Sequence, residues 1–205
     1  MKMNLYEKKQ DELLKINTIG RDDNRADLYH HPYEPTPYCV LERLAESGFF
    51  DRDSTVVDYG CGKGRVGFFL SRETGARTVG IEYDPRIYKD AIENKISADK
   101  ADKVDFVLIS AEDYCLPSEI DRCYFFNPFS VTILRRVMAR ILESYYLNPR
   151  EILLFFYYPS DEYMGYLMTV DELEFYDEID CDDLFEGDNK RERVMVFCLP
   201  YYEQE

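Results

Sequence analysis

The residues with the clearest chemical potential are an aspartate and a run of glycines. Asp58 follows three β-branched or apolar residues. Three glycines come next, at every second position: Gly60, Gly62 and Gly64. Residues 66–70 then show an apolar pattern typical of a helix. This order predicts a buried strand, a tight turn and a helix start, which together bring backbone N–H groups close to a bound ligand.

Further polar residues follow other predicted strands. Glu82 ends a strand about twenty residues after the glycine turn, where a carboxylate can accept hydrogen bonds from two ribose hydroxyls. The segments 110–113 (SAED) and 127–129 (NPF) follow the third and fourth strands. In a doubly wound sheet the ligand lies beyond the carboxyl ends of the strands, where the strand order reverses. These segments are therefore expected to surround one site.

The elements that must position these residues alternate between strand and helix. Strands are expected at residues 55–57, 78–82, 104–109, 123–126, 152–158, 173–176 and 194–199. Helices are expected at residues 5–16, 131–147 and 161–170, after the glycine turn, and from residues 36 and 85 onward. Their expected N-caps are Thr36, Asp84 and Ser130.

This order predicts an α/β fold with a doubly wound, seven-stranded and mainly parallel sheet. Helices are expected on both faces, and the last two strands are expected to form an antiparallel hairpin at one edge. The acidic segment 177–190 between them is expected to be a long, exposed connection. We expect residues 1–35 to form a helical extension that acts as a lid, and residues 36–205 to form the ligand-binding domain.

Composition limits the partners. The net charge is −16, and residues 151–205 hold 16 acidic and three basic residues, a net of −13. A nucleic-acid partner is unlikely on this ground, because binding to phosphates requires a cationic surface. The apolar runs are too short to span a membrane, and no signal peptide opens the chain. Six scattered cysteines without a CxxC pair favour reduced thiols and a cytoplasmic location. The two histidines are adjacent and lack ligand spacing, so no metal site is expected.

Taken together, these motifs resemble those of the class I, Rossmann-like methyltransferases that depend on S-adenosylmethionine (SAM). The resemblance covers residues 33 to the C-terminus. VVDYGCGKGRV resembles the first motif of the family, GIEYDP the second, SAEDYCLP the third and FFNPF the fourth. Within this family, the sequence most resembles a group of small bacterial methyltransferases that carry an EPTPY-like segment and an FNPF segment.

The resemblance implies a role in SAM binding for ten residues: Asp58, Gly60, Cys61, Gly62, Gly64, Glu82, Tyr83, Ser110, Ala111 and Asn127. Asp58 would organise the turn, Glu82 would hold the ribose diol and Tyr83 would flank the adenine. Ser110 departs from the family, which often has a carboxylate there, and Asp113 could take over that contact.

The motifs expected to bind the methyl acceptor are less specific than those expected to bind the cofactor. NPFS resembles the (D/N)PP(Y/F) motif of methyltransferases that act on amino and amide groups, which favours a nitrogen acceptor. The same residues also describe a plain strand-to-helix turn. Tyr33, Thr36, Pro128 and Phe129 are expected to line the acceptor pocket.

Candidate catalytic residues are Asn127, which could accept a hydrogen bond from an NH₂ group, and Glu34, which could act as a base or bind an amine. His30 or His31 could take up a proton near neutral pH. For Glu34 and the two histidines, an ordinary surface-loop position is the simpler interpretation.

The resulting hypothesis is methyl transfer from SAM to a small-molecule or protein acceptor, with nitrogen favoured. One alternative is an NAD(P)-dependent oxidoreductase, although the spacing GxGxG differs from the GxGxxG of dinucleotide sites. Another is a SAM-binding protein that has lost its chemistry and uses its acidic C-terminal quarter for docking. The sequence does not predict the oligomeric state.

Overall fold

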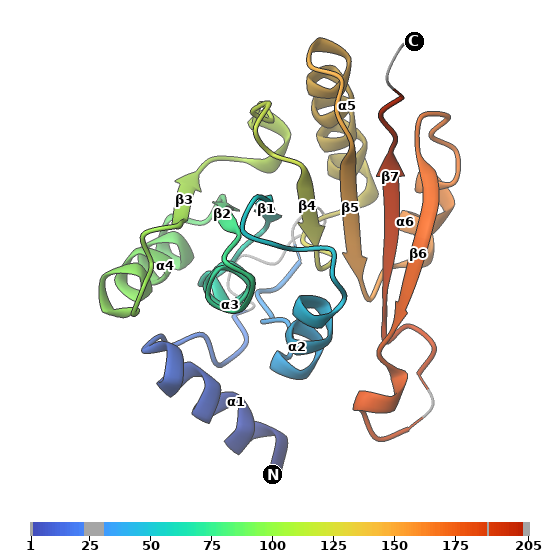
Figure 1. Ribbon diagram of the computed structural model, residues 1–205. Helices are drawn as coiled ribbons and strands as arrows, with labels where there is room; N and C mark the ends of the chain where they lie inside the picture. The colour runs from blue at the N-terminus through green and yellow to red at the C-terminus, as the bar shows by residue number, and fades with distance from the viewer. Residues whose placement is uncertain (1, 23–30, 188, 203–205) are drawn as a thin grey trace.

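A seven-stranded β-sheet organises the chain (Figure 1). The structure, a computed structural model, describes residues 2–22, 31–187 and 189–202. Its strands are β1 (Thr55–Tyr59), β2 (Arg77–Glu82), β3 (Val104–Leu108), β4 (Arg122–Phe125), β5 (Ile152–Tyr157), β6 (Glu174–Asp180) and β7 (Arg193–Leu199). Its α-helices are α1 (Lys2–Leu14), α2 (Tyr38–Glu46), α3 (Arg65–Thr74), α4 (Pro85–Ser97), α5 (Val131–Leu147) and α6 (Asp161–Leu167). Two short 3₁₀ turns are η1 (Ala111–Asp113) and η2 (Asp182–Leu184).

The strand order is β3-β2-β1-β4-β5-β7-β6. Strands β1 to β5 are parallel, whereas β7 is antiparallel to both of its neighbours, β5 and β6. The predicted mainly parallel sheet with an antiparallel pair at one edge is confirmed. Because β1 pairs with β2 on one side and with β4 on the other, the strand order reverses beside β1.

The sheet is covered on both faces, as predicted (Figure 1). Strand β5 is buried along its whole length, and its side chains alternate between two cores. Ile152, Leu154 and Phe156 pack in the core that contains residues of α5 and α6. Leu153 and Phe155 pack in the core that contains residues of α2 and α3. Dispersion and burial on both faces thus fix the sheet as the rigid support of the site.

The N-terminal helix α1 lies beside α2 and α3 (Figure 1). A carboxylate oxygen of Glu7 in α1 accepts a hydrogen bond from the backbone N–H of Tyr38, the first residue of α2. Leu14 and Ile16, at the end of α1, are buried in the same core as α2 and α3. The N-terminal extension is therefore packed on the domain through both polar and apolar contacts.

Two expected helix caps differ from the structure. The N-cap of α2 is Pro37, and the hydroxyl of Thr36 forms a hydrogen bond with the hydroxyl of Tyr124 at 2.9 Å. Ser130 occupies the N-cap position of α5, but its Oγ is one of the buried oxygens without a partner among the described residues. Asp84 does cap α4, because its Oδ1 accepts a hydrogen bond from the N–H of Arg86 at 2.9 Å.

The prediction of a long exposed connection over residues 177–190 is wrong in part. Strand β6 continues to Asp180, because its pairing with β7 extends to Arg193. Cys181 is buried, and Asp183 forms an ion pair with Arg43 of α2. Within the described residues, every helix is too short or too polar to cross a membrane.

Candidate cofactor and acceptor site

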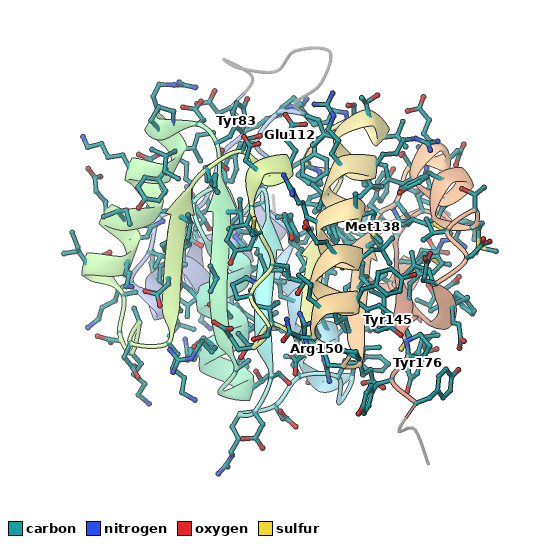
Figure 2. All side chains as sticks on the ribbon, turned by 90° about the horizontal axis from the view of Figure 1, so that it is seen from above. Tyr83, Glu112, Met138, Tyr145, Arg150 and Tyr176 are labelled. Atoms are coloured by element: carbon teal, nitrogen blue, oxygen red, sulfur yellow. The ribbon has the colours of Figure 1, made fainter. Side chains whose placement is uncertain are left out.

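A cavity lies at the carboxyl ends of β1, β2, β3 and β4, where the strand order reverses. Tyr83 follows β2 and Glu112 follows β3, and Figure 2 shows both toward one edge of the view. Arg150, which precedes β5, lies toward the opposite edge. The wall of the cavity includes seven of the residues singled out for the cofactor: Asp58, Gly60, Cys61, Glu82, Tyr83, Ser110 and Ala111. The structure thus brings together residues that lie more than fifty positions apart in the sequence.

The glycine turn is a place of very close approach. Gly60 has a φ of 76° and Gly62 a φ of 55°, both in the left-handed region that favours glycine. A Cβ atom on Gly60 would lie 2.4 Å from the Cβ of Pro128, and one on Gly62 would lie 2.2 Å from the ring of Tyr33. The turn therefore contacts the 127–129 segment on one side and the N-terminal segment on the other.

The backbone N–H groups of this turn are used within the protein. Those of Gly60 and Cys61 donate to the carbonyl oxygen of Ile81, at 2.9 and 3.0 Å. That of Gly62 donates to Oε2 of Glu82 at 3.1 Å. We expected these groups to face a ligand, but they connect β1 to β2. The glycines serve close packing instead, and Gly62 itself lies beneath Tyr33.

Glu82 is the organising carboxylate of the site. Its Oε1 accepts hydrogen bonds from the N–H groups of Tyr83 and Asp84, at 2.9 and 2.8 Å. Its Oε2 accepts the bond from Gly62, and only 5% of the residue is exposed. Burial raises the pKa of Glu82, while these three N–H donors act in the opposite direction. The side chain is thus fixed in the cavity wall with one bond at Oε2, which leaves capacity for a ligand hydroxyl.

Asp58 is a second buried carboxylate in the same wall, with 4% of its surface exposed. Its Oδ2 has no hydrogen-bond partner among the described residues. Burial, and secondarily the negative charge of Glu82, raise the pKa of Asp58 to about 8. An unpaired carboxyl group in a cavity is costly unless a ligand supplies a donor or a positive charge.

These features fit SAM. The unsatisfied oxygen of Asp58 suits an ammonium group, and Glu82 suits a ribose diol. Apolar side chains of the wall, including Ile87 and Ala111, suit the faces of an adenine ring. Ser110 lines the cavity, whereas Asp113 is exposed, so the proposed substitution of Asp113 for a family carboxylate gains no support.

Residues 31–36, which we call the strap, all line this cavity. At one end, the N–H of His31 donates to the carbonyl oxygen of Pro128 at 3.3 Å. In the middle, the hydroxyl of Tyr33 donates to the carbonyl oxygen of Thr18 at 2.5 Å. Tyr33 and Thr36, both expected in the acceptor pocket, thus lie in the cavity wall. His30 lies outside the described residues.

Glu34 lines the cavity but is largely exposed. Its side chain is 58% exposed, and Oε2 lies 3.3 Å from Nη1 of Arg21 in an ion pair. The position is compatible with contact to a cationic acceptor, while the exposure keeps the carboxylate well solvated.

Asn127 is placed differently from our expectation. Its Oδ1 accepts a hydrogen bond from the N–H of Ser160 at 3.2 Å, and its Nδ2 donates to the carbonyl oxygen of Tyr158. The side chain therefore holds the loop between β5 and α6, and each of its polar atoms already has a partner within the protein. Pro128 and Phe129 do line the cavity as expected, and Phe129 is only 3% exposed.

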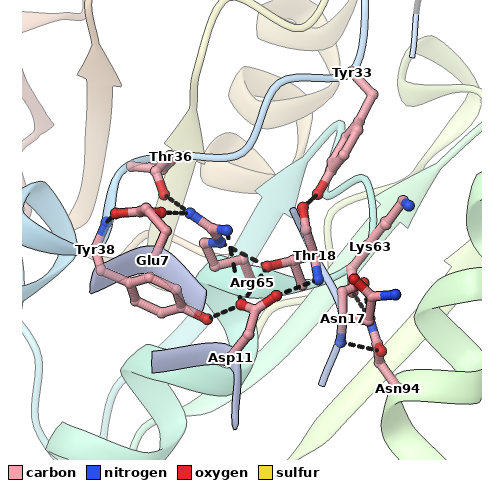
Figure 3. A network of polar contacts seen from close by, with 10 residues as sticks. All are labelled: Glu7, Asp11, Asn17, Thr18, Tyr33, Thr36, Tyr38, Lys63, Arg65 and Asn94. Atoms are coloured by element: carbon pink, nitrogen blue, oxygen red, sulfur yellow. Dashed lines mark hydrogen bonds and ion pairs between the residues drawn. The ribbon is translucent and has the colours of Figure 1, made fainter. Parts of the chain in front are cut away.

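Arg65 is the main site residue that sequence reasoning missed. It is 3% exposed and lies in the cavity wall at the first position of α3. Its Nε donates to the hydroxyl of Thr18 at 2.7 Å, and its Nη1 donates to the carbonyl oxygen of Thr36 at 3.1 Å and to Glu7 (Figure 3). Arg65 thus joins α1 and the strap to the glycine turn. A charge directly after the last glycine, at the start of an apolar helix, was the available signal.

Comparisons with known proteins identify the class of domain that this chain resembles. Residues 56–146 match the family model described as a methyltransferase domain. A curated relative, a protein-lysine N-methyltransferase of Saccharolobus islandicus, is 33% identical over 66 residues. That match spans 32% of this chain and 41% of the relative, so the chain covers less than half of that protein.

Solved structures show the same fold. An RNA methyltransferase from Salinibacter ruber, solved with S-adenosyl-L-homocysteine (SAH), is 25% identical with a TM-score of 0.56, over 84% of this chain and 97% of that one. A human methyltransferase 10 domain containing protein is 13% identical with a TM-score of 0.61, over 98% and 96% of the two chains. The chain therefore has a Rossmann-like methyltransferase fold, residues 56–146 match a methyltransferase domain, and the SAH-bound structure indicates SAM as the cofactor.

Proposed function

We propose that this protein transfers a methyl group from SAM to a nitrogen atom of a cationic small molecule or protein side chain. The observation that carries this proposal is the cavity beside β1, with Asp58 and Glu82 buried together in its wall. SAM supplies an activated methyl group on a positively charged sulfur, so the reaction needs no nucleophilic side chain. The residues of this chain bind the cofactor, align the acceptor and exclude water.

Each part of the cavity has a role in this proposal. Asp58 binds the ammonium of the cofactor, and Glu82 binds its ribose. Pro128 and Phe129 border the position of the methyl group, by the resemblance of their segment to the fourth family motif. The strap and α1 act as a lid, which Arg65 connects to the glycine turn.

Charge supports a cationic acceptor. The chain has a net charge of −16, and Asp22 and Glu34 contribute carboxylates to the cavity wall. A negative field attracts lysine side chains and amines and repels phosphates. The curated relative that acts on protein lysine points to the same acceptor class. The six free thiols suit a cytoplasmic location.

RNA is the second candidate acceptor, because the similar Salinibacter ruber structure is an RNA methyltransferase. Its weakness is electrostatic: the described surface carries the same acidic excess that disfavours binding to phosphates. A SAM-binding protein without transfer activity is the third.

Two measurements test these possibilities. In a thermal-shift titration, SAM and SAH are expected to stabilise the protein and NAD(P)H is not. Transfer of labelled methyl from SAM is then measured to poly-L-lysine, to small amines and to total RNA. Labelling of RNA alone would replace the nitrogen proposal by the RNA candidate. Stabilisation by NADH alone would refute the cofactor assignment, and binding without any transfer would favour the inactive protein.

A further inference from the structure

His31 is held at the cavity in a defined orientation. Its Nδ1 lies 2.7 Å from the backbone carbonyl oxygen of Asn127, and its own N–H donates to the carbonyl oxygen of Pro128. A carbonyl oxygen can only accept a hydrogen bond, so Nδ1 must carry the proton of this bond. In the neutral imidazole, Nε2 then has a free lone pair. The structure thus fixes both the position and the tautomer of His31.

The other ionisable groups of the cavity are poorly suited to take up a proton from an acceptor. Asp58 and Glu82 are buried and are assigned to the cofactor in the proposed function, and Glu82 already accepts three N–H bonds. Burial raises the pKa of Tyr33 far above its ordinary value, and its hydroxyl is bonded to Thr18.

Three further groups face the same space. Cys61 is buried, and burial raises the pKa of its thiol well above the ordinary value. Glu34 and Asp22 form ion pairs with Arg21 and Arg86, respectively. These two carboxylates already face cations, whereas Nε2 of His31 offers the lone pair of a general base toward the cavity.

We propose that Nε2 of His31 accepts the proton that a cationic amine acceptor must lose before it can be methylated. This inference rests on the proposed nitrogen acceptor. An ammonium group has no lone pair, so it cannot attack a methyl carbon. Transfer of one proton to Nε2 leaves a neutral amine and an imidazolium.

The amine lone pair then forms the nitrogen–carbon bond while the carbon–sulfur bond breaks, and that electron pair remains on sulfur. The product leaves as a methylated ammonium, and the imidazolium returns its proton to water, because His31 is exposed at the cavity mouth. The location agrees with this role. His31 contacts Asn127 and Pro128, which belong to the segment that resembles the fourth family motif, near the transferred methyl.

The test compares wild type with His31→Asn, using poly-L-lysine as acceptor and binding of SAH as the control measurement. The amide NH₂ of asparagine can replace Nδ1–H toward the carbonyl of Asn127, but it offers no base. We expect kcat to fall about 100-fold near neutral pH, with SAH affinity unchanged. The ratio of wild-type to variant kcat should shrink as the pH rises toward the pKa of the acceptor amine, which then loses its proton unaided.

A purely structural role for His31 would give a ratio that is constant with pH, and this outcome would overturn the proposal. Glu34→Gln serves as the competing variant, and a larger, pH-dependent loss there would assign the base to Glu34 instead. Nitrogen NMR of the SAH complex gives an independent readout, because the sequence has only two histidines. An Nε2–H tautomer at His31 would refute the proposal.

The proposal of a nitrogen acceptor and the proposal for His31 can be refuted separately. Wild type that binds SAH but leaves poly-L-lysine and small amines unlabelled refutes the nitrogen acceptor, and with it the role of His31. Wild type that labels poly-L-lysine as fast as His31→Asn at every pH refutes only the role of His31.

Discussion

Replacement of Asp58 by asparagine should stabilise the free protein while weakening its binding of cofactor. Asp58 is buried, its Oδ2 has no partner among the described residues, and its pKa is raised from 3.8 to about 8. The folded state therefore holds this proton more tightly than the unfolded chain does. The stability contributed by the proton is complete below pH 3.8 and is lost as the pH rises toward about 8.

The size of the effect follows from the difference between the two pKa values. At about 1.4 kcal/mol for each pH unit between the two pKa values, the loss of stability from about pH 4 to about pH 8 is at most about 6 kcal/mol. Asp58→Asn has no titratable group at this position. The amount by which its free energy of unfolding exceeds that of wild type should therefore be small near pH 5 and grow toward pH 8. Its affinity for SAH should fall about tenfold or more, because the ammonium loses a charged partner.

Urea unfolding near pH 5 and near pH 8 measures the free energy of unfolding. Circular dichroism follows the transition, because the chain has no tryptophan for fluorescence. Asp102→Asn is the matched control, since Asp102 is exposed, and it should leave the pH dependence as in wild type. If wild type and Asp58→Asn keep a constant difference across this range, the buried carboxyl does not titrate as argued.

Three further variants test other parts of the site. Glu82→Gln should weaken SAH binding at least about tenfold by calorimetry, because a neutral amide replaces the carboxylate that we propose binds the ribose. Unchanged affinity would contradict the ribose assignment. Gly62→Ala should weaken SAH binding, because its Cβ would lie 2.2 Å from the Tyr33 ring and displace it. Gly187→Ala should not, because Gly187 also has a positive φ but has open space around it. Equal effects of the two variants would mean that backbone strain alone acts. Arg65→Met should cost about 3 kcal/mol in urea unfolding and speed hydrogen exchange in α1, because two carboxylates lose their buried cation; unchanged exchange would show that α1 is held by other contacts.

The Arg65 network explains how an N-terminal segment can act on a distant turn (Figure 3). Asp11 accepts hydrogen bonds from the N–H and the hydroxyl of Thr18 and from the hydroxyl of Tyr38, at 2.6, 2.7 and 2.6 Å. The guanidinium of Arg65 lies 4.3 Å from the centre of the Tyr38 ring. Because Arg65 bonds both to Glu7 of α1 and to the carbonyl oxygen of Thr36 in the strap, displacement of the strap and opening of α1 are expected to be coupled.

Several features of the fold could be read from local sequence because they depend on neighbouring residues. The continuous apolar run of β5 requires a strand buried on both faces, and Asp84 followed by Pro85 starts a helix by side-chain chemistry alone. The sequence predictions were wrong where a residue distant in the sequence forms the contact. Thr36 binds Tyr124, 88 positions away, and β6 extends because β7 pairs with it.

The sequence by itself indicated the methyltransferase resemblance, the fold class and SAM as the cofactor, because the glycine spacing, Glu82 and the alternation of strands and helices are local patterns. Only the tertiary structure decided what each side chain does there. It turned Asn127 away toward Tyr158 and Ser160, and it brought His31 to the carbonyl of Asn127. The physical reason is that hydrogen-bond partners at sequence separations of thirty to a hundred residues depend on how the chain packs, and no local pattern encodes that choice.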